Sequence, residues 1–173
     1  SPSVAQEEAT VSVIYRITSF GAGAIQSPTY SNTRAGARIK VSKMHVTNPI
    51  EAKLREGTFL DFFGEDTAPE DPPAFSVKVS PGSLRGDLLV LLIDSGKGMK
   101  PILLDLKKSG LPRSGQYVFN HLPVAVAVKC GEGAKPKFIQ PGKTGSIAAP
   151  AEDKVLQTLF YAGENGKYQK FSS

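Results

Sequence analysis

Cysteine, histidine and tryptophan are scarce in this chain, and their scarcity limits the chemistry it can carry. One of the 173 residues is a cysteine, Cys130, so the chain forms no internal disulfide and no thiolate metal cluster. The two histidines, His45 and His121, are far apart and neither has the i,i+4 partner of a helix-borne metal site. The sequence therefore predicts no metal site and no cofactor.

Long apolar runs are also missing. The longest is Leu88 to Ile93, far short of a bilayer span, so we expect the chain to be peripheral to a membrane at most. The chain starts with the small and polar residues SPSVAQEE and has no initiating methionine. A removed secretory signal or a domain or tag boundary would each explain this start. We adopt the removed signal as the explanation, so residues 1–9 are expected to be a flexible segment that follows it.

Catalytic and phosphate-binding motifs are absent. No G-x-S-x-G elbow occurs, and Gly142-Lys143-Thr144 fails as a phosphate-binding loop because Lys137 stands where the template needs glycine. The net charge of +5 suggests nucleic acid as a partner, but the basic residues are scattered and are not interleaved with aromatic residues. We therefore expect no nucleic-acid partner.

Short alternating segments fill most of the chain, and 17 Gly with 13 Pro supply many turns between them. Two segments are less regular. Ile50–Glu56 is expected to be a helical turn or bend, and the acidic residues and prolines of Glu65–Pro73 predict an exposed loop. The alternation predicts strands at Thr10–Ile17, Ala37–Val46, Thr58–Phe63, Phe75–Val79, Lys143–Ala149 and Val155–Tyr161 with Lys167–Phe171.

The stretch from Gly115 to Gly142 carries the clearest strand pattern. Tyr117–Asn120 and Val124–Val128 alternate with a period of two, which predicts two neighbouring strands of a meander. Asn120 ends the first strand, where an amide side chain can bond the backbone of the turn, so we assign it a structural role.

The continuous apolar run from Asp87 to Asp94 is the most ambiguous segment. It is compatible with a central strand or a helix, and the following Ser95-Gly96-Lys97-Gly98 favours a strand that enters a hairpin and returns over Met99–Leu106. With this hairpin the chain is predicted to be all-β, an antiparallel β-sandwich of about ten to twelve short strands. Residues 10–173 are expected to form a single domain.

The pattern from Tyr117 to Gly142 resembles uncharacterised secreted β-sandwich proteins of bacteria. It comprises Tyr117-x-Phe119-Asn120-x-Leu122, then Val124-x-Val126-x-Val128-x-x-Gly131, then Ile139-x-Pro141-Gly142. Such proteins contain immunoglobulin-like domains of unknown function in envelope and extracellular chains. The resemblance implies export, so a periplasmic or extracellular location, a β-sandwich, and no assigned active site.

The main functional hypothesis is a noncatalytic exported β-sandwich that presents loops to a protein or cell-envelope polysaccharide partner. It rests on the long polar segments Thr18–Gly36 and Gly64–Ala74 and on the lack of a catalytic constellation. Glycan-stacking sites need exposed aromatic rings, and without tryptophan the surface candidates are Tyr30 and Tyr168.

Two alternatives remain open. The first is a hydrolase or lyase of envelope polymers, in which Asp61 or Glu65 works with His45 or His121 as acid or base. It requires one of these carboxylates to lie close to a histidine in a pocket. The second is a structural subunit that assembles by adding an edge strand to a partner.

Overall fold

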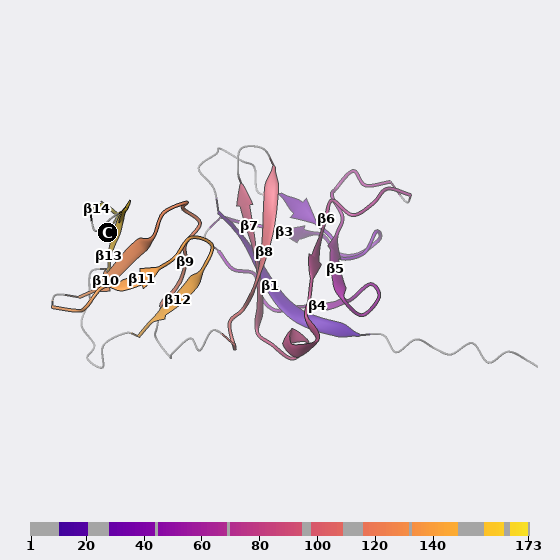
Figure 1. Ribbon diagram of the computed structural model, residues 1–173. Helices are drawn as coiled ribbons and strands as arrows, with labels where there is room; N and C mark the ends of the chain where they lie inside the picture. The colour runs from indigo at the N-terminus through magenta and orange to yellow at the C-terminus, as the bar shows by residue number, and fades with distance from the viewer. Residues whose placement is uncertain are drawn as a thin grey trace, which may run out of the picture. The chain divides into compact units, whose positions relative to one another are not determined.

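Fourteen short strands and one 3-10 turn make up the described part of a computed structural model of the chain (Figure 1). The structure describes residues 11–20, 28–43, 45–68, 70–94, 98–108, 116–131, 133–148, 158–164 and 167–172. The predicted N-terminal segment 1–9, the turn residues 95–97 and the start of the predicted strand at 155–157 lie outside these ranges. No α-helix occurs in the described ranges, so the predicted all-β sandwich class is confirmed.

The contacts of the chain gather into two compact units. The N-terminal unit is Ser1–Leu106 and the C-terminal unit is Lys107–Ser173. The single domain expected over residues 10–173 stays a prediction. The strands of the N-terminal unit are β1 (Ser12–Phe20), β2 (Thr29–Tyr30), β3 (Ile39–Lys40), β4 (Ile50–Lys53), β5 (Phe59–Phe62), β6 (Phe75–Lys78), β7 (Leu88–Asp94) and β8 (Met99–Asp105). Those of the C-terminal unit are β9 (Gln116–Phe119), β10 (Val126–Cys130), β11 (Lys137–Ile139), β12 (Thr144–Ile147), β13 (Thr158–Glu164) and β14 (Lys167–Ser172).

One four-stranded sheet dominates the N-terminal unit, with strand order β4-β1-β7-β8. β7 and β8 pair as the antiparallel hairpin that the apolar run predicted, while β1 and β7 pair in parallel, which makes the sheet mixed. The central position of β7 explains its apolar sequence, because a strand with neighbours on both sides and side chains on two faces has little contact with water. The pairs β5-β6 and β2-β3 complete the unit.

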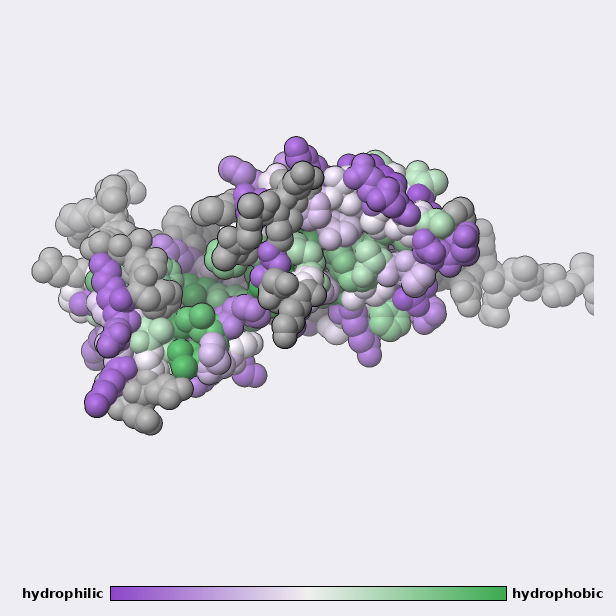
Figure 2. All heavy atoms as spheres, turned by 90° about the horizontal axis from the view of Figure 1, so that it is seen from above, coloured by the Kyte–Doolittle hydropathy of each residue, from purple (hydrophilic) through white to green (hydrophobic). Residues whose placement is uncertain are grey.

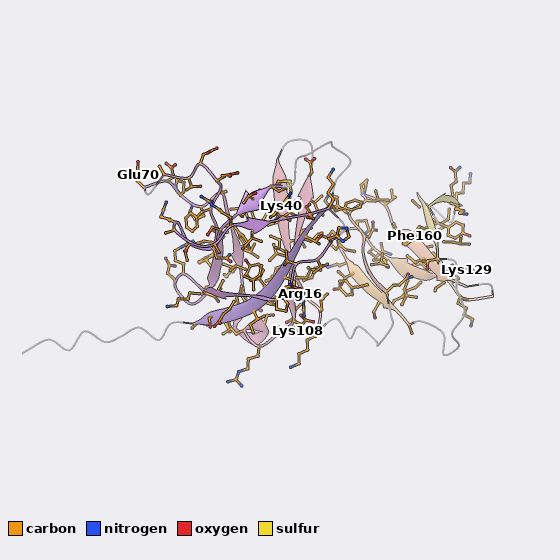
Figure 3. All side chains as sticks on the ribbon, turned by 180° about the vertical axis from the view of Figure 1, so that it is seen from behind. Arg16, Lys40, Glu70, Lys108, Lys129 and Phe160 are labelled. Atoms are coloured by element: carbon orange, nitrogen blue, oxygen red, sulfur yellow. The ribbon has the colours of Figure 1, made fainter. Side chains whose placement is uncertain are left out.

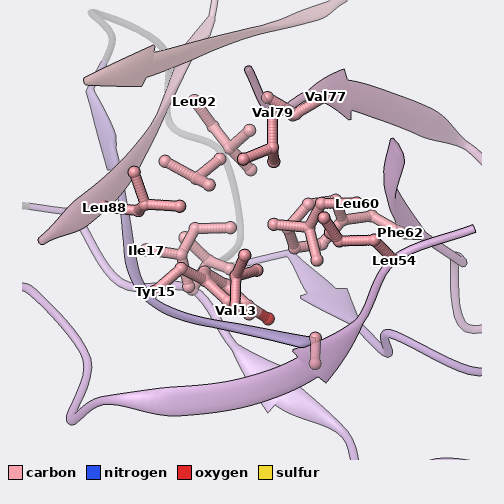
Figure 4. Packing of buried hydrophobic residues seen from close by; sticks show 13 residues of the cluster. Val13, Tyr15, Ile17, Leu54, Leu60, Phe62, Val77, Val79, Leu88 and Leu92 are labelled. Carbon is pink, nitrogen blue, oxygen red and sulfur yellow. The ribbon is translucent and has the colours of Figure 1, made fainter. Parts of the chain in front are cut away.

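The core of the N-terminal unit lies between these layers (Figure 4). Alternate residues of β1 and β7 point inward and meet side chains from β5 and β6, as the two-residue period of a strand requires. Phe62 is fully buried, stacks on Phe75 at 4.6 Å between ring centroids, and meets the edge of Tyr15 at 5.6 Å. The buried cluster is Val13, Tyr15, Ile17, Val41, Ala52, Leu54, Leu60, Phe62, Val77, Val79, Leu88, Val90 and Leu92.

Two expectations for the N-terminal unit were wrong. The strand predicted over Ala37–Val46 is reduced to Ile39–Lys40, because the following backbone bonds to scattered partners, such as Val41 N to Pro28 O at 2.9 Å. The helical turn or bend predicted at Ile50–Glu56 is strand β4, antiparallel to β1, because the open edge of β1 supplies backbone partners that override local preference.

In the C-terminal unit the four strands β11-β10-β13-β14 form one sheet, and β9 pairs with β12 in a separate ladder. The predicted strands over Tyr117–Asn120 and Val124–Val128 exist as β9 and β10, but they are not ladder neighbours, so the predicted meander is wrong at this point. Val126, Val128 and Ile139 form a small buried cluster with Val118, Ile147 and Phe160 packed against it.

Asn120 explains why the chain does not turn back into a hairpin after β9. Its side-chain nitrogen donates to Val124 O and to Ile139 O, both at 2.8 Å, and its side-chain oxygen accepts from Leu122 N at 3.0 Å. Its backbone N–H donates to Lys143 O at 2.9 Å, which extends the β9-β12 ladder. The buried amide thus has all its groups bonded and ties three segments together, in line with its predicted structural role.

Candidate functional site: an aromatic face on the C-terminal sheet

The sheet β11-β10-β13-β14 has one face on the core and one face turned away from it. Val126, Val128 and Phe160 occupy the core face. Because successive side chains of a strand alternate between faces, Ala127 and Lys129 of β10 lie on the opposite face, with their cross-strand partners. Lys129 and Phe160, labelled in Figure 3, therefore belong to opposite faces of this sheet.

Three aromatic residues share that outer face, and the rings of two of them, Phe138 and Tyr168, are in contact. Phe138 of β11 and Tyr161 of β13 are the two cross-strand partners of Ala127, so the three residues form one row. Tyr168 of β14 pairs with Gly163, two residues along β13 from Tyr161, and so has the same orientation. We call Phe138, Tyr161 and Tyr168, with the residues between them, the aromatic face.

The rings of Phe138 and Tyr168 meet although they belong to the two edge strands of the sheet. Their centroids lie 5.4 Å apart at an interplanar angle of 60°. Edge strands of a four-stranded sheet lie about 14 Å apart, so both rings must lean inward over the central strands. Ala127, on the same face in the central strand β10, has only a methyl side chain.

Gly163 is required at its position by a close backbone approach. A Cβ atom there would lie 1.8 Å from Lys167 O, which no side chain can tolerate. Any other residue would displace β14 and, with it, Tyr168.

The aromatic face is accessible. Phe138 is 53% exposed, while Tyr161 and Tyr168 are half-buried and Ala127 is buried beneath them. A large exposed phenylalanine is unusual enough to mark a binding surface when other rings lie beside it. Figure 2 shows apolar surface next to strongly hydrophilic side chains on the C-terminal unit.

Charge is divided unequally between the two units. Residues 107–173 contain ten Lys and Arg and four Asp and Glu, a formal net charge of +6, whereas residues 1–106 contain eleven and twelve, a net charge of −1. On the aromatic face itself, Lys170 pairs with Tyr161, and Lys129 lies two residues from Ala127 along β10. The sequence showed no interleaving of lysines with aromatic residues, but the sheet brings them to one face.

Of the two predicted tyrosines, Tyr168 belongs to the aromatic face and Tyr30 does not. Tyr30 is half-buried, its ring meets Phe75 edge-on at 5.0 Å, and burial raises the pKa of its phenol. It packs against the buried cluster of the N-terminal unit and does not belong to the aromatic face. Phe138 and Tyr161 were missed because the strand pairing that places them beside Tyr168 joins residues far apart in the sequence.

Asp61, the carboxylate proposed for the hydrolase alternative, is held in a structural ion pair. Arg55 Nε donates to Asp61 Oδ2 at 2.7 Å, Arg55 Nη2 to Oδ1 at 3.1 Å, and Ser76 Oγ to Oδ1 at 2.5 Å. Burial acts to raise the pKa of Asp61, but the hydrogen bonds from Arg55 and Ser76 and the charge of Arg55 outweigh it and hold the pKa below its usual value. A carboxylate stabilised in this way is a poor proton donor or acceptor near neutral pH.

The two histidines lie in different units of the chain. His45 and His121 are both exposed, and His121 stacks on Phe119 of the adjacent strand at 6.1 Å. Glu65 is also exposed, and its backbone carbonyl accepts from Arg38 Nη2 at 3.0 Å. Over the described ranges, no three His, Cys, Asp or Glu residues lie together as a metal-binding group.

The two polar segments expected to act as display loops are partly built into the fold. Residues 18–20 continue β1, and Ser31 exchanges backbone hydrogen bonds with Phe63 at 2.9 and 2.8 Å. Arg38 Nη1 donates to Gly64 O at 2.9 Å and Arg34 Nη1 donates to Ala68 O at 2.7 Å. Two arginines therefore bind the backbone of the acidic segment, Gly64–Ala74. Most described residues of the acidic segment are nevertheless exposed, so it is an accessible surface whose backbone the two arginines hold in place.

Comparison of the chain with protein families, curated proteins and solved structures finds no match. The described residues contain no helix with the length and apolar character of a membrane span.

Proposed function

We propose that this protein is a noncatalytic, exported β-sandwich protein that binds a cell-envelope glycan through the aromatic face of its C-terminal sheet. The observation that carries the proposal is the meeting of Phe138 and Tyr168 on an accessible outer face. Pyranose rings present apolar C–H groups that pack on aromatic rings, while their hydroxyl groups bond to polar groups at the margin. Tyrosine supplies both kinds of contact.

The size of the face favours a glycan over a folded protein. A specific protein interface buries about 800 Å² on each partner. Three aromatic rings, two of them half-buried, expose much less than this. A chain of sugars needs only one ring for each sugar that it stacks, so a small face is sufficient.

The two alternatives have less support. Asp61 is committed to Arg55 and Ser76, which leaves the exposed Glu65 as the carboxylate of the hydrolase alternative. Edge-strand addition at β14 would bring a partner strand against Lys167 and Lys170, and lysine on an edge strand opposes such pairing.

The test is binding of the purified full-length chain to soluble glycans, measured by isothermal titration calorimetry and affinity electrophoresis. Phe138→Ala and Tyr168→Ala should each weaken binding by about fivefold to tenfold, because each removes a stacking contact of about 1 kcal/mol. The matched control is Phe20→Ala, because Phe20 is also an exposed phenylalanine, 63% exposed, and belongs to the N-terminal unit.

Wild-type affinity in both ring variants would contradict the proposal, as would failure to bind any glycan tested. Turnover of ester or glycosidic bonds in the same samples would contradict the noncatalytic assignment. Circular dichroism of each variant verifies that the loss of binding is not a loss of folding.

A further inference from the structure

We infer that the glycan bound by the aromatic face is anionic, a polysaccharide whose sugars carry carboxylate groups. This inference rests on the proposed function and adds the chemical class of the ligand. Its basis is the position of two lysines, Lys129 and Lys170, on the same face as the three rings.

The two lysines flank the rings on different strands. Lys170 of β14 is the cross-strand partner of Tyr161, so its side chain starts beside that ring. Lys129 of β10 pairs with Leu159, one row away from the row of Ala127 and Phe138. A polymer lying over the rings would pass within reach of both ammonium groups, because lysine has a long flexible stem.

The described strand residues of this face include no negative side chain. Among the described strand residues that share it, the charged ones are Lys129 and Lys170, and the others are Ala127, Phe138, Leu159, Tyr161, Gly163 and Tyr168. The C-terminal unit as a whole carries a net charge of +6. A surface with cations, rings and no described carboxylate attracts an anionic polymer and gives a neutral polymer no such advantage.

Single-stranded nucleic acid is the other anionic polymer that stacks on aromatic rings, and the geometry favours it less. Base stacking uses a whole ring face, and nucleic-acid grooves add a track of cations along the backbone. Here Tyr168 is half-buried against Phe138, the two rings are inclined at 60°, and the described face offers two lysines. Sugars need only part of a ring face, and the two tyrosine hydroxyl groups suit their hydroxyl groups.

The experiment compares two polymers with one backbone. Polygalacturonate carries a carboxylate on every sugar, and its fully methyl-esterified form has the same backbone without the charge. The full-length chain should bind polygalacturonate about tenfold more tightly at low salt, and the difference should shrink as salt is added, because exposed charges are screened.

Lysine variants assign this difference to the aromatic face. The double variant Lys129→Gln with Lys170→Gln should lose most of the preference for polygalacturonate and keep the affinity for the esterified polymer. The matched control is Lys40→Gln with Lys53→Gln, which removes the same charge from exposed positions of the N-terminal unit and should retain the preference.

The outcomes separate the two proposals. If the esterified polymer binds as tightly as polygalacturonate, and Phe138→Ala weakens both, the glycan-binding proposal holds and the anionic ligand is overturned. If neither polymer binds, the proposed function itself fails. Tighter binding of an oligothymidylate of equal charge than of polygalacturonate would overturn the inference in favour of nucleic acid.

Discussion

The two units of this protein place their apolar residues differently. Among the described residues, the buried cluster of the N-terminal unit contains thirteen residues, whereas that of the C-terminal unit contains three, Val126, Val128 and Ile139. The C-terminal unit keeps aromatic residues on its outer face, including Phe138, which is 53% exposed. A single exposed apolar side chain such as Phe20 is ordinary, whereas an exposed ring that contacts a second ring on the same sheet face supports the proposed ligand site.

Polar groups follow the same division. In the N-terminal unit Asp61 is bonded by Arg55 and Ser76, and the acidic segment is fastened by Arg34 and Arg38, so charges are used to hold the fold. The C-terminal unit has excess positive charge, and two of its lysines lie on the aromatic face. This difference is consistent with the proposal that the C-terminal unit carries the binding face.

The largest expected effect is the loss of Phe62. Phe62→Ala removes a fully buried ring that packs on Tyr15 and Phe75, and it should lower the free energy of unfolding by about 3–5 kcal/mol. Urea denaturation followed by circular dichroism measures the loss, and hydrogen exchange should locate it in the N-terminal unit. Phe20→Ala, at a 63% exposed position, should cost less than about 0.5 kcal/mol. Equal losses of unfolding free energy for Phe62→Ala and Phe20→Ala would contradict the assignment of Phe62 to the core of the N-terminal unit.

An intermediate effect is expected at Asn120. Asn120→Ala leaves the carbonyl groups of Val124 and Ile139 without their amide donor, which should cost about 2–3 kcal/mol and act on the C-terminal unit. Faster hydrogen exchange over residues 116–148, with unchanged exchange over residues 11–94, is the expected signature. Asn48→Ala, at an exposed position, is the control and should leave both regions unchanged.

The smallest expected effect is a change in the pH dependence of stability when Asp61 is replaced. Because its folded pKa lies below the ordinary value of 3.8, ionised Asp61 stabilises the fold above about pH 4, and this contribution is lost as the pH falls through the folded pKa. Asp61→Asn should therefore be less stable at neutral pH and show a shallower loss of stability in acid. Acid titrations followed by circular dichroism measure this, with Asp66→Asn as the exposed control. Identical acid profiles for Asp61→Asn and wild type would show that the ion pair does not hold the N-terminal unit.

Local patterns predicted the strands better than their partners. The run Leu88–Ile93 and the alternation in Tyr117–Asn120 each became a strand, because apolar periodicity and β-branched or aromatic residues act within a few positions. The pairing of β9 with β12, and the parallel pairing of β1 with β7, depend on residues far along the chain. No local signal marks such partners, and the backbone edge that happens to be open decides between them.

The candidate site shows the same limit. Tyr168 was recognised from its polar sequence surroundings, but so was Tyr30, which packs against the N-terminal core. Phe138 was passed over because it is separated from Tyr168 by thirty positions of sequence and reaches it only across the sheet.

The sequence by itself determined that this chain is all-β, that it has too few cysteines and histidines for a thiolate or histidine metal site, and that Asn120 serves the structure. These properties follow from residue types and short periods. Only the tertiary structure decided which strands are neighbours, which tyrosine faces outward, and that lysines and rings meet on one face. Cross-strand pairing brings distant residues into one row, and this proximity in space has no counterpart along the chain.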